Sequence, residues 1–326
     1  MGFGSKETLR FDKQENSQTL SIVLQIEGKG KFQIPERILS KVISDSIVQI
    51  LFDSILPKPF VVTSERTGIS LFYKELDVSK NRIFKQLAAS DDINPIDLLN
   101  SMRSRYAEPI DDNIKVIRDY EELSKRKSFL RENRAKYKYV LDALQDLLCG
   151  SFKTINKQLV FSPKKERNRE KVTIPVYLAS SSIKSLFLID FYINCLAEKN
   201  GLLIIDEPEL NLHPENQRKM ASLLAKLINS GIKVLVTTHS DFLLRELNNR
   251  IMLSSNIKNK DKLLRKNCIS PEEILKPSQV KAYSFDKNHK ILESTVDKFG
   301  INMEIFDDVI SNTNSLSNEI YYSIEE

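Results

Sequence analysis

Two groups of polar residues follow apolar segments in the second half of the chain, and their types suit one chemical task. Asp206 and Glu207 come directly after Leu202–Ile205, which is apolar at every position. His239 comes shortly after the next apolar segment, Val234–Val236. Two adjacent carboxylates are useful when the ligand is a magnesium nucleotide, because one can hold the hydrated ion and the other can orient a water molecule.

The spacing of these segments predicts that both groups lie at one edge of a sheet. Between them, residues 214–231 have helical periodicity, with Pro214 suited to a first turn and Gly231 to the end of the helix. A strand, helix and strand of this length predict two parallel strands, Leu202–Ile205 and a buried Val234–Val236. Open α/β sheets bind ligands at the carboxyl ends of such strands. For the acidic dipeptide alone, simple strand termination is the better explanation.

A serine-rich segment upstream has the residue types of an anion site. Ser180, Ser181 and Ser182 precede a predicted helix, so hydroxyls and free backbone N–H groups converge where the helix dipole is positive. Lys184 adds a positive charge. The alternative is a serine cap that binds no ligand.

These segments resemble the motifs of ABC-class ATPases. The string Leu202–Pro214 resembles a Walker B motif followed by a D-loop, and Val234–Ser240 resembles the strand of the switch histidine. Leu178–Leu186 is similar to the signature segment. The group concerned is the AAA-type ATP-binding proteins with an ABC core, which includes RecF, SMC and overcoming-lysogenisation-defect relatives. Weaker likeness, including Thr63–Gly68, extends over most of the chain.

The resemblance implies an α/β, P-loop NTPase-like parallel-sheet core with ATP and Mg²⁺ as cofactors, and it implies roles for individual residues. Asp206 would hold Mg²⁺, Glu207 would polarise the attacking water, and His239 would sense the γ-phosphate, unless it merely caps the next helix. The remaining predicted nucleotide-binding residues are Ser180, Ser181, Ser182, Lys184 and Asn211. Relatives usually carry glycine at the position of Ser182.

The phosphate-binding loop of this class, GxxxxGK[ST], does not occur in the sequence. Without its amides and lysine, the β- and γ-phosphates lose their main cradle. Three explanations stay open: a truncated or mis-started reading frame, which we favour, a degenerate subunit that lends its signature face to a complete partner, or a fold that keeps the motifs without turnover.

The expected function is therefore ATP binding and hydrolysis by an AAA-type ATPase with little turnover by this chain alone. Relatives suggest coupling to DNA transactions or phage defence. The alternative is a non-enzymatic interaction or nucleic-acid-binding module with a degenerate ATPase fold. The expected partners are a second copy or a complete ATPase subunit, bound at the signature and D-loop face, together with DNA and a separate nuclease subunit.

Composition narrows the class of protein further. The chain has 326 residues, of which 41% are hydrophobic and 29% charged, as in ordinary globular proteins. No apolar run approaches the ~18 residues of a membrane span, so we expect no membrane association. Three widely spaced cysteines exclude a disulfide framework and favour a cytoplasmic location. A net charge of +5 makes contact with a polyanion plausible.

Pattern changes along the chain predict three parts. Residues 1–78 form the N-terminal part of the ATPase core, with a β-hairpin of Thr19–Ile26 and Lys31–Ile34, a helix from residue 38 to 51 and a strand at Phe60–Val62. Residues 79–150 form a helical insertion. Residues 151–326 form the C-terminal ATPase lobe. In this lobe, Val176–Leu178 is predicted to be a strand, and Gly201 is predicted to supply a left-handed helix cap.

A basic segment lies within the predicted insertion. It contains seven lysines and arginines between Lys125 and Lys138, with Tyr137 and Tyr139 interleaved. The favoured interpretation is a solvated helix face with Glu121, Glu122 and Glu132 as partners. The alternative is an arm that contacts phosphates.

Overall fold

The computed structural model divides the chain into two compact units, Met1–Leu56 and Pro57–Glu326. It describes residues 7–13, 20–26, 40, 43–44, 47–48, 51–52, 59–73, 75, 106–156, 158–164, 172–285 and 288–324. In the first unit, β1 (Glu7–Lys13) and β2 (Leu20–Ile26) form an antiparallel hairpin. The described positions between 40 and 52 are all helical, as the periodicity predicts.

The first strand of the predicted hairpin is present as β2, and it pairs with the upstream strand β1. Phe11 lies opposite Ile22, and Leu9 lies opposite Leu24. The β1 strand also alternates polar and apolar residues, and this pattern is the half-buried signal that identified β2. The predicted partner Lys31–Ile34 lies outside the described residues.

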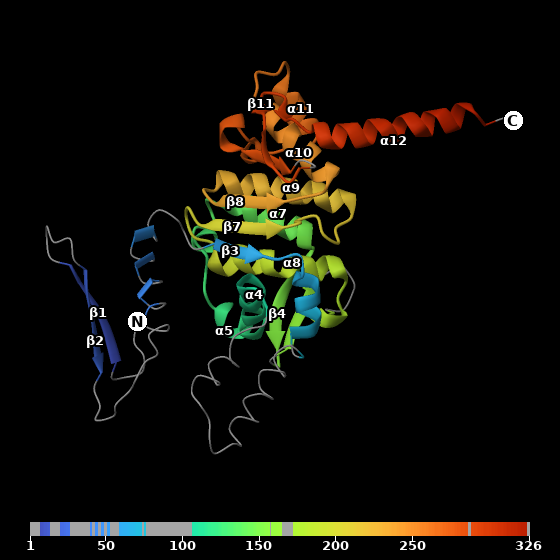
Figure 1. Cartoon of the computed structure of the whole chain (residues 1–326). Coiled ribbons are helices and arrows are strands. Elements are labelled where there is room, and N and C mark those ends of the chain that lie inside the picture. Colours follow the sequence, from blue (N-terminus) through green and yellow to red (C-terminus); the bar gives the residue numbers. More distant parts are fainter. Residues whose placement is uncertain are drawn as a thin grey trace. The chain divides into compact units, whose positions relative to one another are not determined.

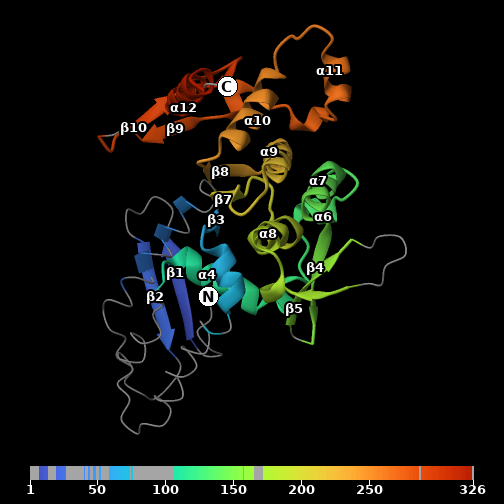
Figure 2. The same cartoon turned by 90° about the vertical axis from the view of Figure 1, so that its right-hand side faces the viewer.

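A three-stranded parallel sheet lies at the centre of the second unit (Figure 1). The strand order is β3 (Pro59–Val62), β7 (Leu202–Asp206) and β8 (Lys233–Thr237), with β7 in the middle. Figure 2 shows α8 (Ser181–Phe191) and α9 (Pro214–Asn229) on the same side of this sheet. The observed topology confirms the predicted α/β, P-loop NTPase-like class.

The crossover between β7 and β8 has the predicted form. Helix α9 begins at Pro214 and buries one apolar face, and Gly231 has a φ of 98° beyond its end. A side chain rarely adopts this conformation, so glycine suits the turn. The buried apolar residues of α9 are Met220, Ala221, Leu223, Leu224, Ala225 and Leu227.

Three local predictions are wrong. Val176–Leu178 forms a 3₁₀ turn, because the short strand β6 (Ile174–Pro175) ends at a proline that fixes φ in a turn-compatible range. The left-handed residue before β7 is Asn200, with a φ of 64°, instead of Gly201. Strand β8 is not buried throughout: its residues alternate, and Leu235 is 51% exposed, as expected for a strand with one covered face.

Helices occupy the described part of the predicted insertion. They are α4 (Glu108–Arg118), α5 (Tyr120–Leu123), α6 (Phe129–Glu132) and α7 (Lys138–Leu148). Buried residues of α4 and α7 belong to the same hydrophobic core as β7, and Asn113 of α4 donates a hydrogen bond of 2.7 Å to the carbonyl of Val61 in β3. The predicted boundaries at 79 and 150 stay a prediction.

An antiparallel sheet, β4 (Gly150–Ile155), β5 (Gln158–Pro163) and β6, adjoins these helices. After β8 the chain continues through two helices, four short strands and a long last helix. These elements are α10 (Asp241–Met252), α11 (Lys260–Lys266), β9 (Ala282–Phe285), β10 (Ile291–Ser294), β11 (Val296–Asp297), β12 (Gly300–Ile301) and α12 (Glu304–Tyr322).

All three cysteines are free, as predicted. Among the helices that the structure describes, none has both the length and the apolar character needed to cross a bilayer.

Candidate functional site

The carboxyl ends of β7 and β8 bring the predicted acidic pair and the histidine together. Asp206 and Thr237 are register partners in the parallel ladder. One residue further, the N–H of Glu207 donates to the carbonyl of Thr237 at 3.2 Å. The Nε2 atom of His239 lies 4.0 Å from Oε1 of Glu207. The neighbouring strands therefore place these three side chains at one edge, as their spacing predicts.

Glu207 and His239 differ in accessibility. The Glu207 side chain is 34% exposed and the His239 side chain 87% exposed. Glu207 also has a φ of 49°, in the left-handed region that residues with a side chain seldom adopt. The chain therefore turns sharply where β7 ends, and both side chains are accessible to a ligand.

The carboxylate of Asp206 is stabilised in its ionised form. A hydrogen bond from the hydroxyl of Thr237 lowers the pKa of Asp206 most, hydrogen bonds from Ser64 lower it further, and the charge of Arg66 contributes. Partial burial acts in the opposite direction but does not prevail. Asp206 is therefore negatively charged at neutral pH, as a ligand of a divalent cation must be.

Arg66 is a component of the site that sequence reasoning missed. Its side chain is fully buried, and its two terminal nitrogens donate to the carbonyls of Asp206 at 2.7 Å and Glu207 at 2.6 Å. The Nε atom donates to the carbonyl of Ser185 in α8 at 3.0 Å. Burial lowers the pKa of Arg66 to about 10, so the guanidinium stays charged at neutral pH. Arg66 thus connects the end of β7 with the serine-led helix.

The signal for Arg66 was present but weak. It lies in Thr63–Gly68, which carries only a faint likeness to the family, and no periodicity shows which backbone a buried arginine will bind. Thr237 was also missed as a functional residue, although its register opposite Asp206 follows from the strand pairing.

Glu209 organises the segment that carries the histidine. Its Oε1 atom accepts hydrogen bonds of 2.8 Å from the hydroxyl of Thr238 and from the N–H of His239. Its Oε2 atom is buried and has no hydrogen-bond partner among the described residues. The side chain that caps α10 is Ser240, which accepts from Leu243 N at 3.1 Å. The alternative role of His239 as the helix cap is therefore wrong.

The serine-rich segment adjoins residues 209–213, the part of the chain that resembles a D-loop. Ser180 caps α8 by accepting from Ile183 N at 3.3 Å, and the hydroxyl of Ser182 donates to the carbonyl of Asn211. The Asn211 side chain donates in turn to the hydroxyl of Thr67 at 3.1 Å. Ser180 and Ser181 are exposed, so their hydroxyls are accessible to an anion. Lys184 is only 8% exposed, and its predicted contribution to anion binding is untested.

The side chains at this edge can hold Mg²⁺, but they do not form a complete binding site for phosphates. Mg²⁺ is commonly held by one or two carboxylates together with water and substrate phosphates, and Asp206 and Glu207 supply such carboxylates. Within the part of the chain that the structure describes, no three His, Cys, Asp or Glu side chains gather as a complete metal site. The sequence also lacks the GxxxxGK[ST] loop. The site therefore suits a metal ion that arrives with phosphate ligands.

Solved structures with similarity to the chain include two SMC ATPases. One, from work on ATP-driven dimerisation and DNA-stimulated activation of these enzymes, is 13% identical, covers 56% of this chain and 94% of that chain, and has a TM-score of 0.29. The other is an Smc head domain of Pyrococcus furiosus with an extended coiled coil, bound to the C-terminal domain of ScpA. It is 16% identical, covers 70% of this chain and 64% of that chain, and has a TM-score of 0.26.

No curated protein matches the chain. The sequence profile described as AAA ATPase domain matches residues 5–244. This range includes the serine-rich segment, the acidic pair, residues 209–213 and His239, and it amounts to well over half of the chain. The chain therefore belongs to the AAA ATPase domain family.

Proposed function

We propose that the carboxyl edge of β7 and β8 binds magnesium ATP and that this chain forms part of an ATP-hydrolysing site. The observation that carries the proposal is the meeting of Asp206, Glu207 and His239, with 4.0 Å between His239 Nε2 and Glu207 Oε1. Ligands of open α/β sheets bind at this edge.

The position of each residue determines its proposed role. Asp206, held ionised by Thr237, would be the Mg²⁺ ligand, and the ion would neutralise charge on the phosphates. Glu207 accepts a hydrogen bond from the attacking water and orients it. His239, the more exposed of the pair, contacts the terminal phosphate. Arg66 holds the carbonyls behind both acidic residues, so it positions them without touching the ligand.

The signature and D-loop segments suggest that a second subunit completes the site. Ser180 and Ser181 at the start of α8 present exposed hydroxyls. The Ser182 hydroxyl is engaged with Asn211, which ties this surface to the D-loop of the same chain. A complete ATPase subunit would supply the phosphate cradle that this sequence lacks, whereas a second copy of this chain would contribute only its own signature and D-loop surface. ATP-driven dimerisation described for an SMC ATPase fits this arrangement. A role in DNA transactions or phage defence, a nuclease partner and a cytoplasmic location stay predictions.

A non-catalytic role is the second candidate because the sequence contains no GxxxxGK[ST] loop. In that case the acidic edge would be retained from a catalytic ancestor and the chain would act through its partners. Binding of magnesium ATP without hydrolysis, alone and with added partner, would favour this role.

Isothermal titration of the full chain with ATP, with and without Mg²⁺, tests the proposed function. We expect Mg²⁺-dependent binding that Asp206→Asn weakens about tenfold or more, because removing a hard anionic ligand costs cation affinity. Where phosphate release is detectable, Glu207→Gln should abolish it while preserving binding.

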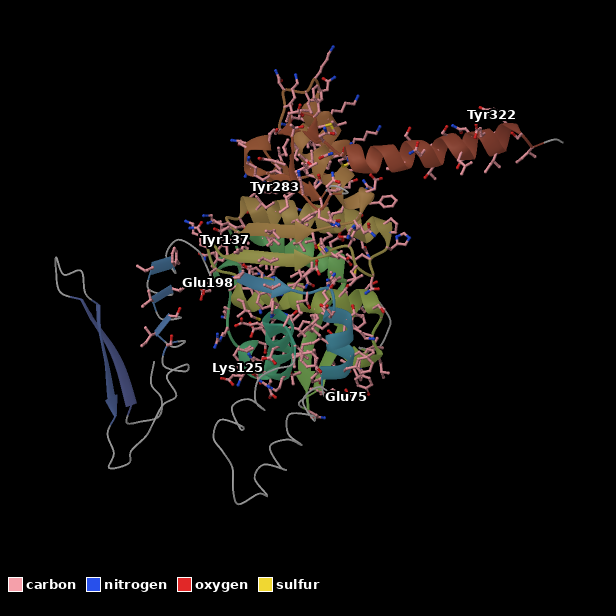
Figure 3. The ribbon with its side chains drawn as sticks, viewed as in Figure 1. Glu75, Lys125, Tyr137, Glu198, Tyr283 and Tyr322 are labelled. Carbon is pink, nitrogen blue, oxygen red and sulfur yellow. The ribbon has the colours of Figure 1, made fainter. Side chains whose placement is uncertain are left out.

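Glu198→Gln is the matched control, because Glu198 is an exposed carboxylate near the amino end of β7 (Figure 3). Equal binding by wild type and Asp206→Asn, or binding that does not depend on Mg²⁺, would contradict the proposal.

A further inference from the structure

A second charged surface lies away from the sheet edge, on α11 and the chain on either side of it. We define the α11 patch as the six basic residues Lys258, Lys260, Lys262, Arg265, Lys266 and Lys276. Five of them are exposed, and Lys260 is half-buried. None of the six forms an ion pair with a described residue. The positive charge of this patch is therefore not neutralised within the described protein.

The acidic residues nearby do not cancel this charge. Residues 253–281 contain seven lysines and arginines against Asp261, Glu272 and Glu273. Glu273 is buried and paired with Lys226 and Arg250. Like charges held close together repel one another unless an anion accompanies them, so an uncompensated group of this kind favours an anionic partner.

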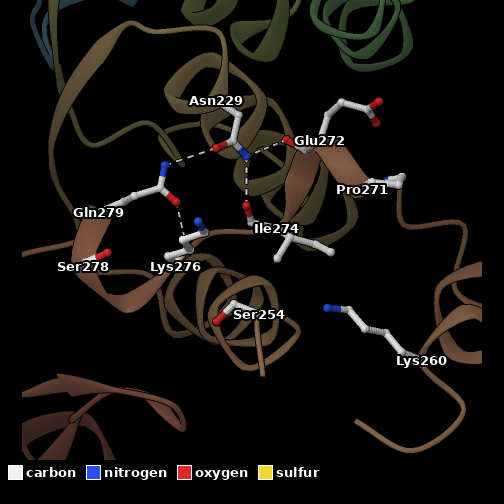
Figure 4. Close-up of a pocket in the computed structure, with 9 residues that line it drawn as sticks. All are labelled: Asn229, Ser254, Lys260, Pro271, Glu272, Ile274, Lys276, Ser278 and Gln279. Atoms are coloured by element: carbon white, nitrogen blue, oxygen red, sulfur yellow. Dashed lines mark hydrogen bonds between the residues drawn. The ribbon is translucent and has the colours of Figure 1, made fainter. Parts of the chain in front are cut away.

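The patch borders an open hollow of about 780 Å³. Lys260 and Lys276 line it from different sides, and Figure 4 shows the ammonium end of Lys260 directed toward its middle. Ser254, Ser278 and Gln279 add polar groups to the lining. One wall is fixed by Asn229, whose amide donates to the carbonyls of Glu272 and Ile274 at 2.9 Å. Two residues of the patch, Lys260 and Lys276, therefore lie beside neutral hydrogen-bonding groups in a concave surface, and the other four lie outside its lining.

The chemistry of these groups favours the phosphodiester backbone of nucleic acid. Lysine, arginine, serine and glutamine side chains are the usual donors to phosphate oxygens. Residues 253–281 contain no aromatic residue, so the surface has no platform for stacking unpaired bases. Leu263 is the exposed large apolar residue of α11, at 40%, and one such side chain gives little area for insertion into a lipid surface.

From these observations we infer that the α11 patch binds the backbone of duplex nucleic acid without sequence preference. The inference is independent of the proposed nucleotide site, because no residue of the patch belongs to that site. It also differs from the predicted phosphate-contacting arm at Lys125–Lys138, where Tyr137 is only 7% exposed and cannot stack on a base.

Fluorescence anisotropy with a labelled 24-base-pair duplex of scrambled sequence tests the inference, over a series of salt concentrations. The test variant is Lys262→Ala/Arg265→Ala/Lys266→Ala. Each phosphate contact contributes about 0.9 to the slope of log affinity against log salt. The variant should therefore lower that slope by up to about 3 and weaken binding at least about tenfold near 0.1 M salt.

The matched control is Lys125→Ala/Arg126→Ala/Lys127→Ala, which removes the same number of exposed charges from the other basic segment and should retain most of the affinity. Circular dichroism checks that both variants fold. A single-stranded probe and vesicles of phosphatidylcholine with phosphatidylserine should bind more weakly than the duplex. The inference is overturned by absence of duplex binding, by equal losses in the two triple variants, or by preferential binding to the vesicles.

Discussion

The sheet edge and the α11 patch are both charged, but they are built in opposite ways. At the sheet edge two of the three acidic side chains accept hydrogen bonds from within the protein: Thr237 donates to Asp206, and Thr238 donates to Glu209. The fully buried Arg66 lies behind them. On the α11 patch the basic side chains have no ion pairs with described residues. Asp206 and Glu209 are therefore held in place before a ligand arrives, whereas the patch would acquire its counter-charges only on binding.

This difference determines how each region responds to substitution. Preorganised polar groups in a partly buried site are coupled to the fold, so changing one of them affects stability as well as chemistry. Exposed charges without partners contribute little to stability and act through long-range attraction, which salt screens. Variants of the sheet edge should therefore change the stability of the protein, and variants of the α11 patch should change mainly its salt-dependent binding.

Replacing Arg66 should have the largest effect. Arg66→Ala leaves four carbonyl oxygens, those of Thr63, Ser185, Asp206 and Glu207, without this donor in a buried place. We expect a loss of about 3–5 kcal/mol in the free energy of unfolding, measured with urea.

The control for this prediction is Arg118→Ala. Arg118 is an exposed arginine that pairs with Asp119, and its loss should cost about 0.5 kcal/mol or less. Similar losses in the two variants would show that Arg66 does not support the edge.

Thr237→Val should have an intermediate effect. Without the hydroxyl that donates to Asp206, the pKa of Asp206 should rise toward its ordinary value of 3.8. We expect a loss of about 1 kcal/mol near pH 7, because the bond goes to a charged but partly exposed group.

The pH dependence of the Thr237→Val effect has a definite sign. A lowered folded-state pKa stabilises the protein above the unfolded-state pKa, and this stabilisation disappears as the pH falls through the folded-state value. The difference between Thr237→Val and wild type should therefore shrink as the pH falls below 3.8, the ordinary pKa value for this carboxyl. Carbon-13 titration of the Asp206 carboxyl by NMR would measure the expected rise in the pKa of Asp206. An unchanged pKa in Thr237→Val would refute the role of the hydroxyl.

Substitution within the α11 patch should have the smallest effect on stability. Lys262→Ala/Lys266→Ala should change the free energy of unfolding by no more than about 0.5 kcal/mol, because both side chains are exposed and unpaired among the described residues. A larger loss in urea unfolding would show that these lysines serve the fold.

Sequence alone predicts those parts of the fold and site that depend on local pattern. The strand, helix and strand from Leu202 to Thr237 follow from apolar runs, Pro214 and Gly231, and they correctly place Glu207 beside His239. Parallel neighbours share an edge whatever their detailed packing, so this prediction needs no tertiary information.

The errors arise where tertiary packing decides. The pairing of β2 with β1 was not predicted, because the segments upstream and downstream of β2 both alternate and pairing energy depends on cross-strand neighbours. The exposure of Leu235 depends on which face of the sheet is covered by helices. Arg66 bonds to carbonyls that lie 140 and 141 residues away in the sequence, and no local pattern encodes such a contact.

The most direct test of the proposed nucleotide site replaces Mg²⁺ by paramagnetic Mn²⁺ bound to ATP and follows the amide signals of the full chain by NMR. The account predicts strong broadening at Glu207 and His239 and little at Glu198, at the opposite end of β7. Broadening centred on Glu198 or elsewhere, or none at Glu207 and His239 at saturating Mn²⁺ and ATP, would contradict it.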